Sequence, residues 1–131
     1  MQGFVDNIET LTAENTDFRR VLYTGQYLQL VLMALQPGEE IGEEVHEEHD
    51  QFFRIESGSG EVLIDGKRTP ITDDDAIIVP AGARHNVFNT GDSPLTLYTL
   101  YGPPEHHVGV ARASRAEAEA KEEHFDGETT E

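Results

Sequence analysis

Two short stretches of the sequence carry side chains whose types and spacing suit a metal site. In the first, EEVHEEHDQ, Glu44 precedes His46 by two residues and Gln51 follows five residues later. Side chains two residues apart on a β-strand point to the same face, so Glu44 and His46 would project together. A short turn through residues 47–50 would return Gln51 on the adjacent strand. In the second stretch, PAGARHNVFN, His85 follows a Pro-x-Gly turn that precedes a strand.

Four such side chains from three strands could surround one ion. Two imidazoles, one carboxylate and one amide oxygen would leave two positions of an octahedral metal open, and these donors suit iron, manganese, nickel, copper or zinc. Glu44, His46 and His85 alone would form the two-histidine, one-carboxylate set of non-haem iron oxygenases. His49 is the competing fourth ligand. Each histidine also has a plainer interpretation, as a solvated or turn residue of an acidic chain.

Several other chemistries are excluded by what the sequence lacks. It has no cysteine, so disulfides, thiolate metal sites and thiol nucleophiles are ruled out. It also has no glycine-rich phosphate loop, no G-x-S-x-G elbow and no H-E-x-x-H pair. What remains is chemistry at an enclosed metal, either polarisation of a substrate oxygen or activation of dioxygen.

The side chains above lie in a region of short β-type runs. These runs are residues 27–35, 43–46, 51–55, 60–64, 76–79, 85–89 and 95–101. Glycine- and proline-rich breaks separate them, and Asp65-Gly66 between two alternating flanks predicts a hairpin turn because glycine tolerates positive φ. Many short strands at this spacing are typical of an all-β sandwich or barrel.

The 131 residues are expected to form one domain with two flanking segments. We expect a loosely structured polar lead-in over residues 1–20, the barrel over residues 21–104 and an acidic tail over residues 105–131. The Ala- and Glu-rich run at 112–123 predicts a short C-terminal helix, with Ser114 as its cap. The tail histidines are expected to be solvated; they are His106, His107 and His124.

The possible ligands belong to two longer spaced patterns. The positions of these patterns are Gly38, Glu44, His46, Gln51 and Gly58, and then Asp74, Pro80, Gly82, His85 and Asn89. The patterns resemble the two motifs of the cupin superfamily, G-x5-H-x-H-x3–4-E-x6-G and G-x5-P-x-G-x2-H-x3-N. The spacing is kept, but Glu44 replaces the first histidine, Gln51 the glutamate and Asp74 the opening glycine. The resemblance covers about residues 25–101 and is to the small single-domain bacterial and archaeal cupins.

The resemblance implies a double-stranded β-helix, which is a jelly-roll barrel. It also implies one divalent transition metal (Mn, Fe, Ni or Zn) at Glu44, His46, Gln51 and His85. Some sugar-processing cupins similar to this chain place glutamine at the position of Gln51 and still bind metal.

Three further side chains could reach the cavity of the barrel beside the metal site and bind substrate there. They are Arg54, Tyr98 and Tyr101, of which Arg54 would be the natural partner of a substrate carboxylate. Their plainer roles are a surface ion pair for the arginine and core packing for the tyrosines.

From the resemblance we expect a metal-dependent enzyme with isomerase-, lyase- or dioxygenase-type chemistry on a small oxygenated metabolite, such as a sugar or sugar acid. The alternative is a non-catalytic cupin that binds a metal or small ligand, or that serves as a dimerisation module. A homodimer is expected because small cupins commonly pair through β-strands.

Acidic residues outnumber basic ones by 26 to 9, which gives a net charge of −17. Such a surface repels phosphate backbones and anionic lipid, so neither nucleic acid nor a membrane is an expected partner. The charge and the scarcity of lysine also predict adaptation to a high-salt cytoplasm, with an acidic mesophilic protein as the alternative. No apolar run is long enough to span a bilayer and the first residues do not read as a signal peptide, so we expect a cytoplasmic protein.

Overall fold

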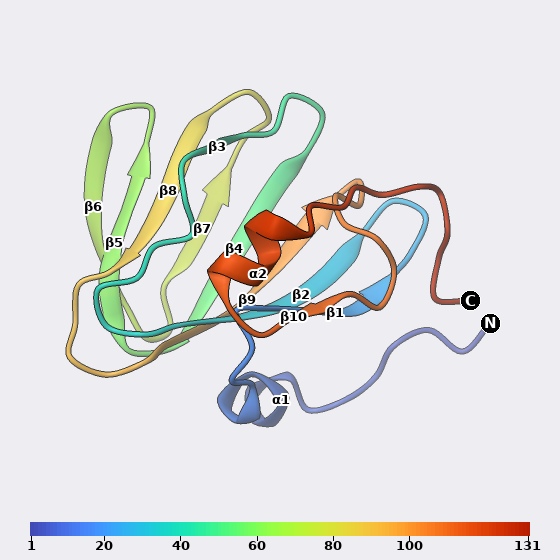
Figure 1. The fold of residues 1–131 in the computed structure, drawn as a ribbon, viewed down its shortest axis with the longest axis horizontal. Helices are drawn as coiled ribbons and strands as arrows, with labels where there is room; N and C mark the ends of the chain where they lie inside the picture. Colours follow the sequence, from blue (N-terminus) through green and yellow to red (C-terminus); the bar gives the residue numbers. More distant parts are fainter.

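The computed structural model describes all 131 residues, which form ten β-strands and two short α-helices (Figure 1). The strands are β1 (Arg19–Thr24), β2 (Gln29–Leu35), β3 (Glu44–Val45), β4 (Asp50–Ser57), β5 (Ser59–Ile64), β6 (Lys67–Thr72), β7 (Ala76–Val79), β8 (Arg84–Asn89), β9 (Leu95–Gly102) and β10 (Ala111–Arg112). The helices are α1 (Ile8–Glu14) and α2 (Arg115–Ala120). The predicted all-β fold with a short C-terminal helix is thus confirmed.

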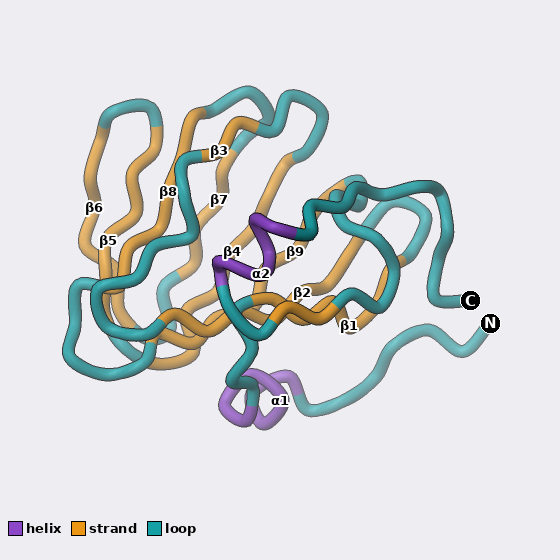
Figure 2. The backbone as a smooth tube through the Cα atoms, in the orientation of Figure 1, coloured by secondary structure: helices purple, strands orange, loops and turns teal.

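The strands form two antiparallel sheets with the buried core between them. The larger sheet has the strand order β10-β1-β2-β9-β4-β7, and the smaller one has the order β3-β8-β5-β6. Val31, Phe53 and Leu97 of the larger sheet pack with Val62 and Val87 of the smaller one in a single apolar cluster. Burial of this apolar surface is the main stabilising contribution to such a two-sheet fold. In Figure 2, α1 lies below the sheets and α2 is drawn in front of them.

Strand β4 places its side chains alternately inside and outside the larger sheet. Gln51 and Phe53 are buried, whereas Phe52 and Arg54 are partly exposed. Side chains alternate along a strand, so Gln51 faces the space between the sheets. Tyr101 lies opposite Gln51 on β9 and faces the same interior.

The C-terminal segment packs on the barrel. Strand β10 pairs with β1, so that Arg112 lies opposite Arg19. Helix α2 begins after its predicted cap, because the Ser114 hydroxyl accepts a hydrogen bond from the Glu117 backbone N–H. The side chain of Gln29 on β2 accepts from the His106 backbone N–H and donates to the His106 carbonyl. These contacts hold the segment across one end of the two sheets.

His106 corrects the expectation that the tail histidines are solvated. It is only 6% exposed. Its Nδ1 lies 3.1 Å from a carboxylate oxygen of Glu123, and its Nε2 lies 3.3 Å from the Tyr101 hydroxyl oxygen. The expectation failed because the pairing of β10 with β1, which local sequence does not reveal, brings this part of the chain against the barrel. His107 and His124 are much more exposed.

The flanks of the barrel contain regular structure near the predicted boundaries. Helix α1 lies within the predicted lead-in, and β1 begins at Arg19, two residues before the predicted start of the barrel. Neither helix has the length and apolar character needed to cross a membrane. The homodimer stays a prediction.

Candidate metal centre

Three of the four predicted ligands converge where β3 meets β8. These strands pair with Glu44 directly opposite His85, and His46 follows β3 by one residue. One possible ligand atom from each of these three residues lies within 4.8 Å of the other two. Gln51 comes from β4 in the other sheet. The side chains of a two-histidine, one-carboxylate set are therefore brought together at one point.

His85 is oriented by its own strand. The residue is 2% exposed, and its Nδ1 lies 3.1 Å from the carbonyl oxygen of Ala83. A carbonyl oxygen only accepts hydrogen bonds, so Nδ1 carries the hydrogen and Nε2 keeps a lone pair. That Nε2 is buried and has no hydrogen-bond partner. Burial also lowers the pKa of His85, which favours the neutral ring that a metal requires.

Gln51 presents a second acceptor without a partner. The residue is 3% exposed, and its Nε2 donates to the Thr99 hydroxyl at 3.0 Å. Thr99 in turn donates to the Phe52 carbonyl, which fixes the direction of this small network. The amide oxygen Oε1 of Gln51 is buried and accepts no hydrogen bond. An unsatisfied buried polar group costs about 1–3 kcal/mol, and coordination to a cation would satisfy each acceptor. The donor set therefore fits a metal ion.

Glu44 and His46 contact each other directly, with 2.8 Å between Glu44 Oε2 and His46 Nε2. Burial by itself would raise the pKa of Glu44, but the hydrogen bond and charge of His46 outweigh it and lower that pKa. Burial by itself would lower the pKa of His46, but Glu44, with a smaller contribution from Glu105, raises it. A cation bound here would have to displace the proton of this pair.

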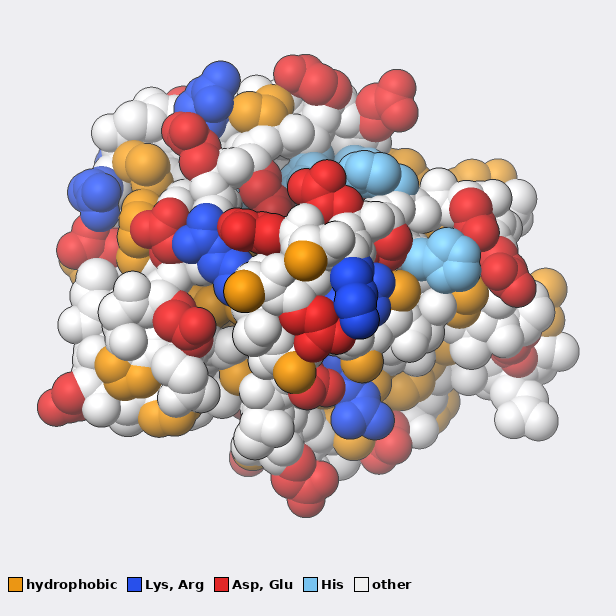
Figure 3. All heavy atoms as spheres, in the orientation of Figure 1, with side chains coloured by type: hydrophobic (Ala, Val, Ile, Leu, Met, Phe, Trp, Pro, Cys, Tyr) orange, Lys and Arg blue, Asp and Glu red, His pale blue; other side chains and the backbone are white.

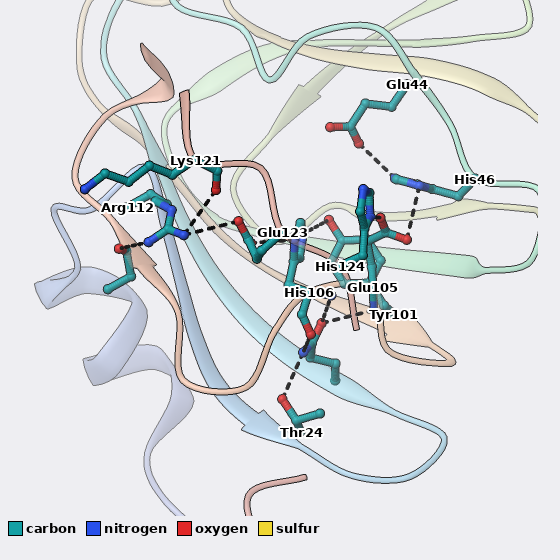
Figure 4. Close-up of polar contacts among 12 residues, drawn as sticks. Thr24, Glu44, His46, Tyr101, Glu105, His106, Arg112, Lys121, Glu123 and His124 are labelled. Atoms are coloured by element: carbon teal, nitrogen blue, oxygen red, sulfur yellow. Dashed lines mark hydrogen bonds and ion pairs between the residues drawn. The ribbon is translucent and has the colours of Figure 1, made fainter. Parts of the chain in front are cut away.

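Glu105, which follows β9, contacts three histidines near this pair. Figure 4 shows two of them, His46 and His124. The Oε2 of Glu105 lies 2.6 Å from His49 Nε2 and 3.7 Å from His46 Nδ1. Its Oε1 lies 3.2 Å from His124 Nδ1. A carboxylate behind a ligating histidine fixes the direction of the ring. Glu105 is therefore placed to orient His46.

His49 does not join the ligand group in the structure. Its Nε2 contacts Glu105, and its Nδ1 lies 2.8 Å from the carbonyl oxygen of Pro103. Both ring nitrogens thus contact oxygen atoms outside the group of Glu44, His46 and His85. As placed, His49 supports Glu105 and leaves Gln51 as the fourth candidate.

A cavity of about 260 Å³ adjoins Glu44 and His46. The C-terminal segment supplies its opposite wall, including His106, Ala118 and Glu123. Figure 3 shows the face that carries α2, where carboxylates and histidines gather. Sites for drug-sized ligands usually measure about 300–1,000 Å³, so this cavity suits a smaller molecule.

Two of the three predicted substrate-binding residues lie away from this cavity. Arg54 and Tyr98 are opposite each other in the β4–β9 pairing, on the outer face of the larger sheet. Arg54 contacts Asp74 at 2.8 Å. The structure therefore corrects the expectation that these two side chains reach the cavity, because strand alternation turns them outward. Tyr101 does face inward, and its ring centroid lies 5.7 Å from that of His46, but it does not line the cavity.

Arg19 and Glu105 also line the cavity, although neither belongs to the spaced patterns of the sequence. The signal for Arg19 is its place two residues before the buried Val21 on the same strand, which turns it inward. Glu105 follows the two prolines that end β9, the strand that carries Tyr101. That position puts it at the same end of the barrel as Tyr101.

The paired antiparallel sheets and the histidines at their opening are the features of a cupin. Residues 31–101 match the family model described as a cupin domain, and the chain belongs to this family.

Its relatives include the uncharacterized protein YrkC of Bacillus subtilis, which is 45% identical over 126 residues, or 92% of this chain and 68% of that one. The crystal structure of BH2720 from Bacillus halodurans is also 45% identical, covers 92% of this chain and 96% of its own, and superposes with a TM-score of 0.90. A predicted oxalate decarboxylase from Thermotoga maritima covers 70% of this chain and 96% of its own, with a TM-score of 0.56. At 20% identity, that likeness is one of fold.

Proposed function

We propose that Glu44, His46, Gln51 and His85 bind one divalent transition metal, with manganese, iron, nickel and zinc as the possible ions. The observation that carries this proposal is the pair of buried acceptors without partners, His85 Nε2 and Gln51 Oε1. The close approach of Glu44, His46 and His85 supports it. Imidazole nitrogen with carboxylate and amide oxygen suits these ions.

We further propose that the site acts on a small oxygenated molecule in the adjoining cavity, with isomerase-, lyase- or dioxygenase-type chemistry. A bound metal would supply Lewis-acid polarisation of a substrate oxygen or dioxygen activation. Glu105 lines the cavity and contacts His46 and His49, so it can hold a proton or pass it to a molecule bound there. General acid–base catalysis needs such a group at hydrogen-bond reach of the substrate.

Elemental analysis of the purified protein tests the metal site. We expect about one equivalent of metal in the wild type and its loss in His85→Ala, with the β-sheet circular dichroism unchanged. His107→Ala is the control, because His107 belongs to a separate exposed group with Asp126 and Glu128. Metal content that falls in His107→Ala but not in His85→Ala would place the ion elsewhere. No uptake by the wild type after incubation with each of the four ions would favour the non-catalytic interpretation.

A further inference from the structure

Arg19 is a buried arginine that the chain leaves without a partner. It is 8% exposed, lies on β1 and lines the cavity beside Glu44 and His46. Its Nε–H donates to no hydrogen-bond partner, and Arg19 takes part in none of the ion pairs of the chain. Five other arginines each contact a carboxylate, and these are Arg54, Arg68, Arg84, Arg112 and Arg115.

A charge in this position is unfavourable, because the guanidinium has lost water and forms no direct ion pair, although its charge attracts those of Glu44 and Glu123. The aromatic ring of Phe18 holds it in place, with the Arg19 Cζ atom 5.5 Å from the ring centroid. A guanidinium over an aromatic face is attracted to the ring while the N–H donors at its edge stay free. Arg19 is therefore fixed beside a cavity with its donors unused.

We propose that Arg19 binds the carboxylate of the substrate, and that the substrate is a small hydroxy- or oxo-carboxylate whose remaining oxygens lie toward Glu44 and His46. This inference rests on the proposed function of the metal site. The planar donor fork of arginine matches a carboxylate with two parallel hydrogen bonds. One unpaired positive charge matches one negative charge, which favours a carboxylate over a phosphate monoester with a charge of about −1.5 to −2.

Other carboxylates of the cavity do not oppose this anion strongly, because several are already engaged with nitrogen groups of their own. These contacts are Glu105 with His49 at 2.6 Å, Glu119 with Arg115 at 2.9 Å and Glu123 with Arg112 at 3.4 Å. Glu122 lies at the exposed rim. Arg19 thus takes the role that the sequence predicted for Arg54, whose guanidinium already contacts Asp74 outside the barrel.

The test compares Arg19→Gln with Arg20→Gln. Arg20 is the next residue of β1 and is exposed on the opposite face, so the control removes the same charge from the same strand. Calorimetry would measure the binding of glycolate, lactate and glycerate, each beside its neutral counterpart ethylene glycol, propane-1,2-diol or glycerol. Each titration is run with and without Mn²⁺ at constant ionic strength. We expect at least one acid to bind the wild type and Arg20→Gln about tenfold more tightly than its neutral counterpart, and Arg19→Gln to lose that preference.

Two results would overturn the assignment of Arg19. Either no acid binds the wild type better than its neutral counterpart, or the preference persists in Arg19→Gln. Metal content, measured on the same samples, keeps the two proposals apart. If the wild type prefers the acids but takes up no metal, the metal site is refuted and the role of Arg19 stands. If the wild type takes up metal but shows no preference for the acids, the role of Arg19 is refuted and the metal site stands.

A stability measurement separates ligand binding from a structural role. Arg19→Met keeps most of the side-chain volume and removes the unpaired charge. We expect its melting temperature to equal or exceed that of the wild type in the absence of any acid. If Arg19 instead stabilised the fold, Arg19→Met would have a lower melting temperature than the wild type, and that outcome would count against the proposal.

Discussion

His106 Nε2 lies 3.3 Å from the hydroxyl oxygen of Tyr101, and this buried contact ties the C-terminal segment to β9. On the other side of the ring, Nδ1 lies 3.1 Å from the carboxylate of Glu123. A carboxylate only accepts, so Nδ1 carries the hydrogen and Nε2 accepts from the hydroxyl of Tyr101, which burial keeps protonated by raising its pKa. Because Tyr101 lies opposite Gln51, the anchor of the segment adjoins the candidate metal centre.

We expect the free energy of unfolding to fall as the pH falls below about 6.5. Burial lowers the pKa of His106 from its ordinary value of 6.5, so the unfolded chain takes up the proton first and acid favours unfolding. Burial by itself would raise the pKa of Glu123, but the hydrogen bond with His106 and the nearby positive charges, Arg19 and Arg112 among them, together outweigh it and lower that pKa. The contribution of Glu123 is thus present above its ordinary value of 4.5 and is lost as the pH falls through the lowered pKa.

Denaturant titrations between about pH 5 and pH 8 would check this on the wild type and His106→Gln. The variant should show a shallower dependence on pH, because it lacks the buried imidazole. Equal slopes in the two proteins would show that other groups determine the acid sensitivity.

The two histidines of the candidate site should titrate in opposite directions in the metal-free protein. Burial by itself would lower the pKa of His46, but the hydrogen bond and charge of Glu44, with the charge of Glu105, together outweigh it and raise that pKa above 6.5, while burial lowers the pKa of His85 below 6.5. NMR titration of the two rings should therefore give His46 the higher midpoint. Metal affinity should decline as the pH falls through the midpoint of His46, because the ion must displace that proton. A higher midpoint for His85 would contradict the described contacts.

Residues on regular strands with motif spacing could be predicted from the sequence. Glu44 and His46 lie together because strand side chains alternate, and the turn glycines hold the strands in register. Gly58 and Gly82 have φ of +97° and +87°, a conformation that other residues adopt at a cost. At Gly58 a Cβ atom would also lie 2.7 Å from the Pro94 carbonyl oxygen. Both glycines therefore serve the backbone geometry.

Two different causes explain why the sequence did not predict the positions of Arg54 and Arg19. Arg54 is three residues after Gln51 on β4, so alternation alone already places the two on opposite faces. The partner of Arg19, by contrast, is β10, far along the chain, and only this long-range pairing brings Arg19 and His106 to one cavity. Strand β6 was missed because it is mostly exposed and contains Pro70, which an edge strand tolerates.

The net charge of −17 leads us to expect a melting temperature that rises with salt. The screening length falls from about 10 Å at 0.1 M to about 3 Å at 1 M, which weakens the repulsion among carboxylates. The high-salt interpretation further predicts loss of the folded signal below roughly 0.5 M NaCl. Thermal melts followed by circular dichroism across this range would measure it, with sucrose as an uncharged stabiliser for comparison. A melting temperature that does not change with NaCl would end the high-salt interpretation.

Glu105→Gln should weaken metal binding by about 10–100-fold and leave the fold intact. Glu105 Oε2 lies 3.7 Å from His46 Nδ1, on the side of the ring opposite Glu44. The glutamine keeps the shape of the side chain but lacks the negative charge that favours a hydrogen on Nδ1 and thereby makes Nε2 a stronger donor to metal. Competition with a chelator would measure the affinity.

The controls for this prediction separate orientation of His46 from the charge of the cavity. Glu122 lines the same cavity but is exposed, so Glu122→Gln changes the net charge equally without touching His46. Similar losses in both variants would assign the effect to charge alone. His49→Gln removes the closest partner of Glu105, at 2.6 Å, and leaves the carboxylate near His46. If Glu105 acts through His46, metal affinity should fall far less in His49→Gln than in Glu105→Gln, since the carboxylate that orients the ligating ring is still present.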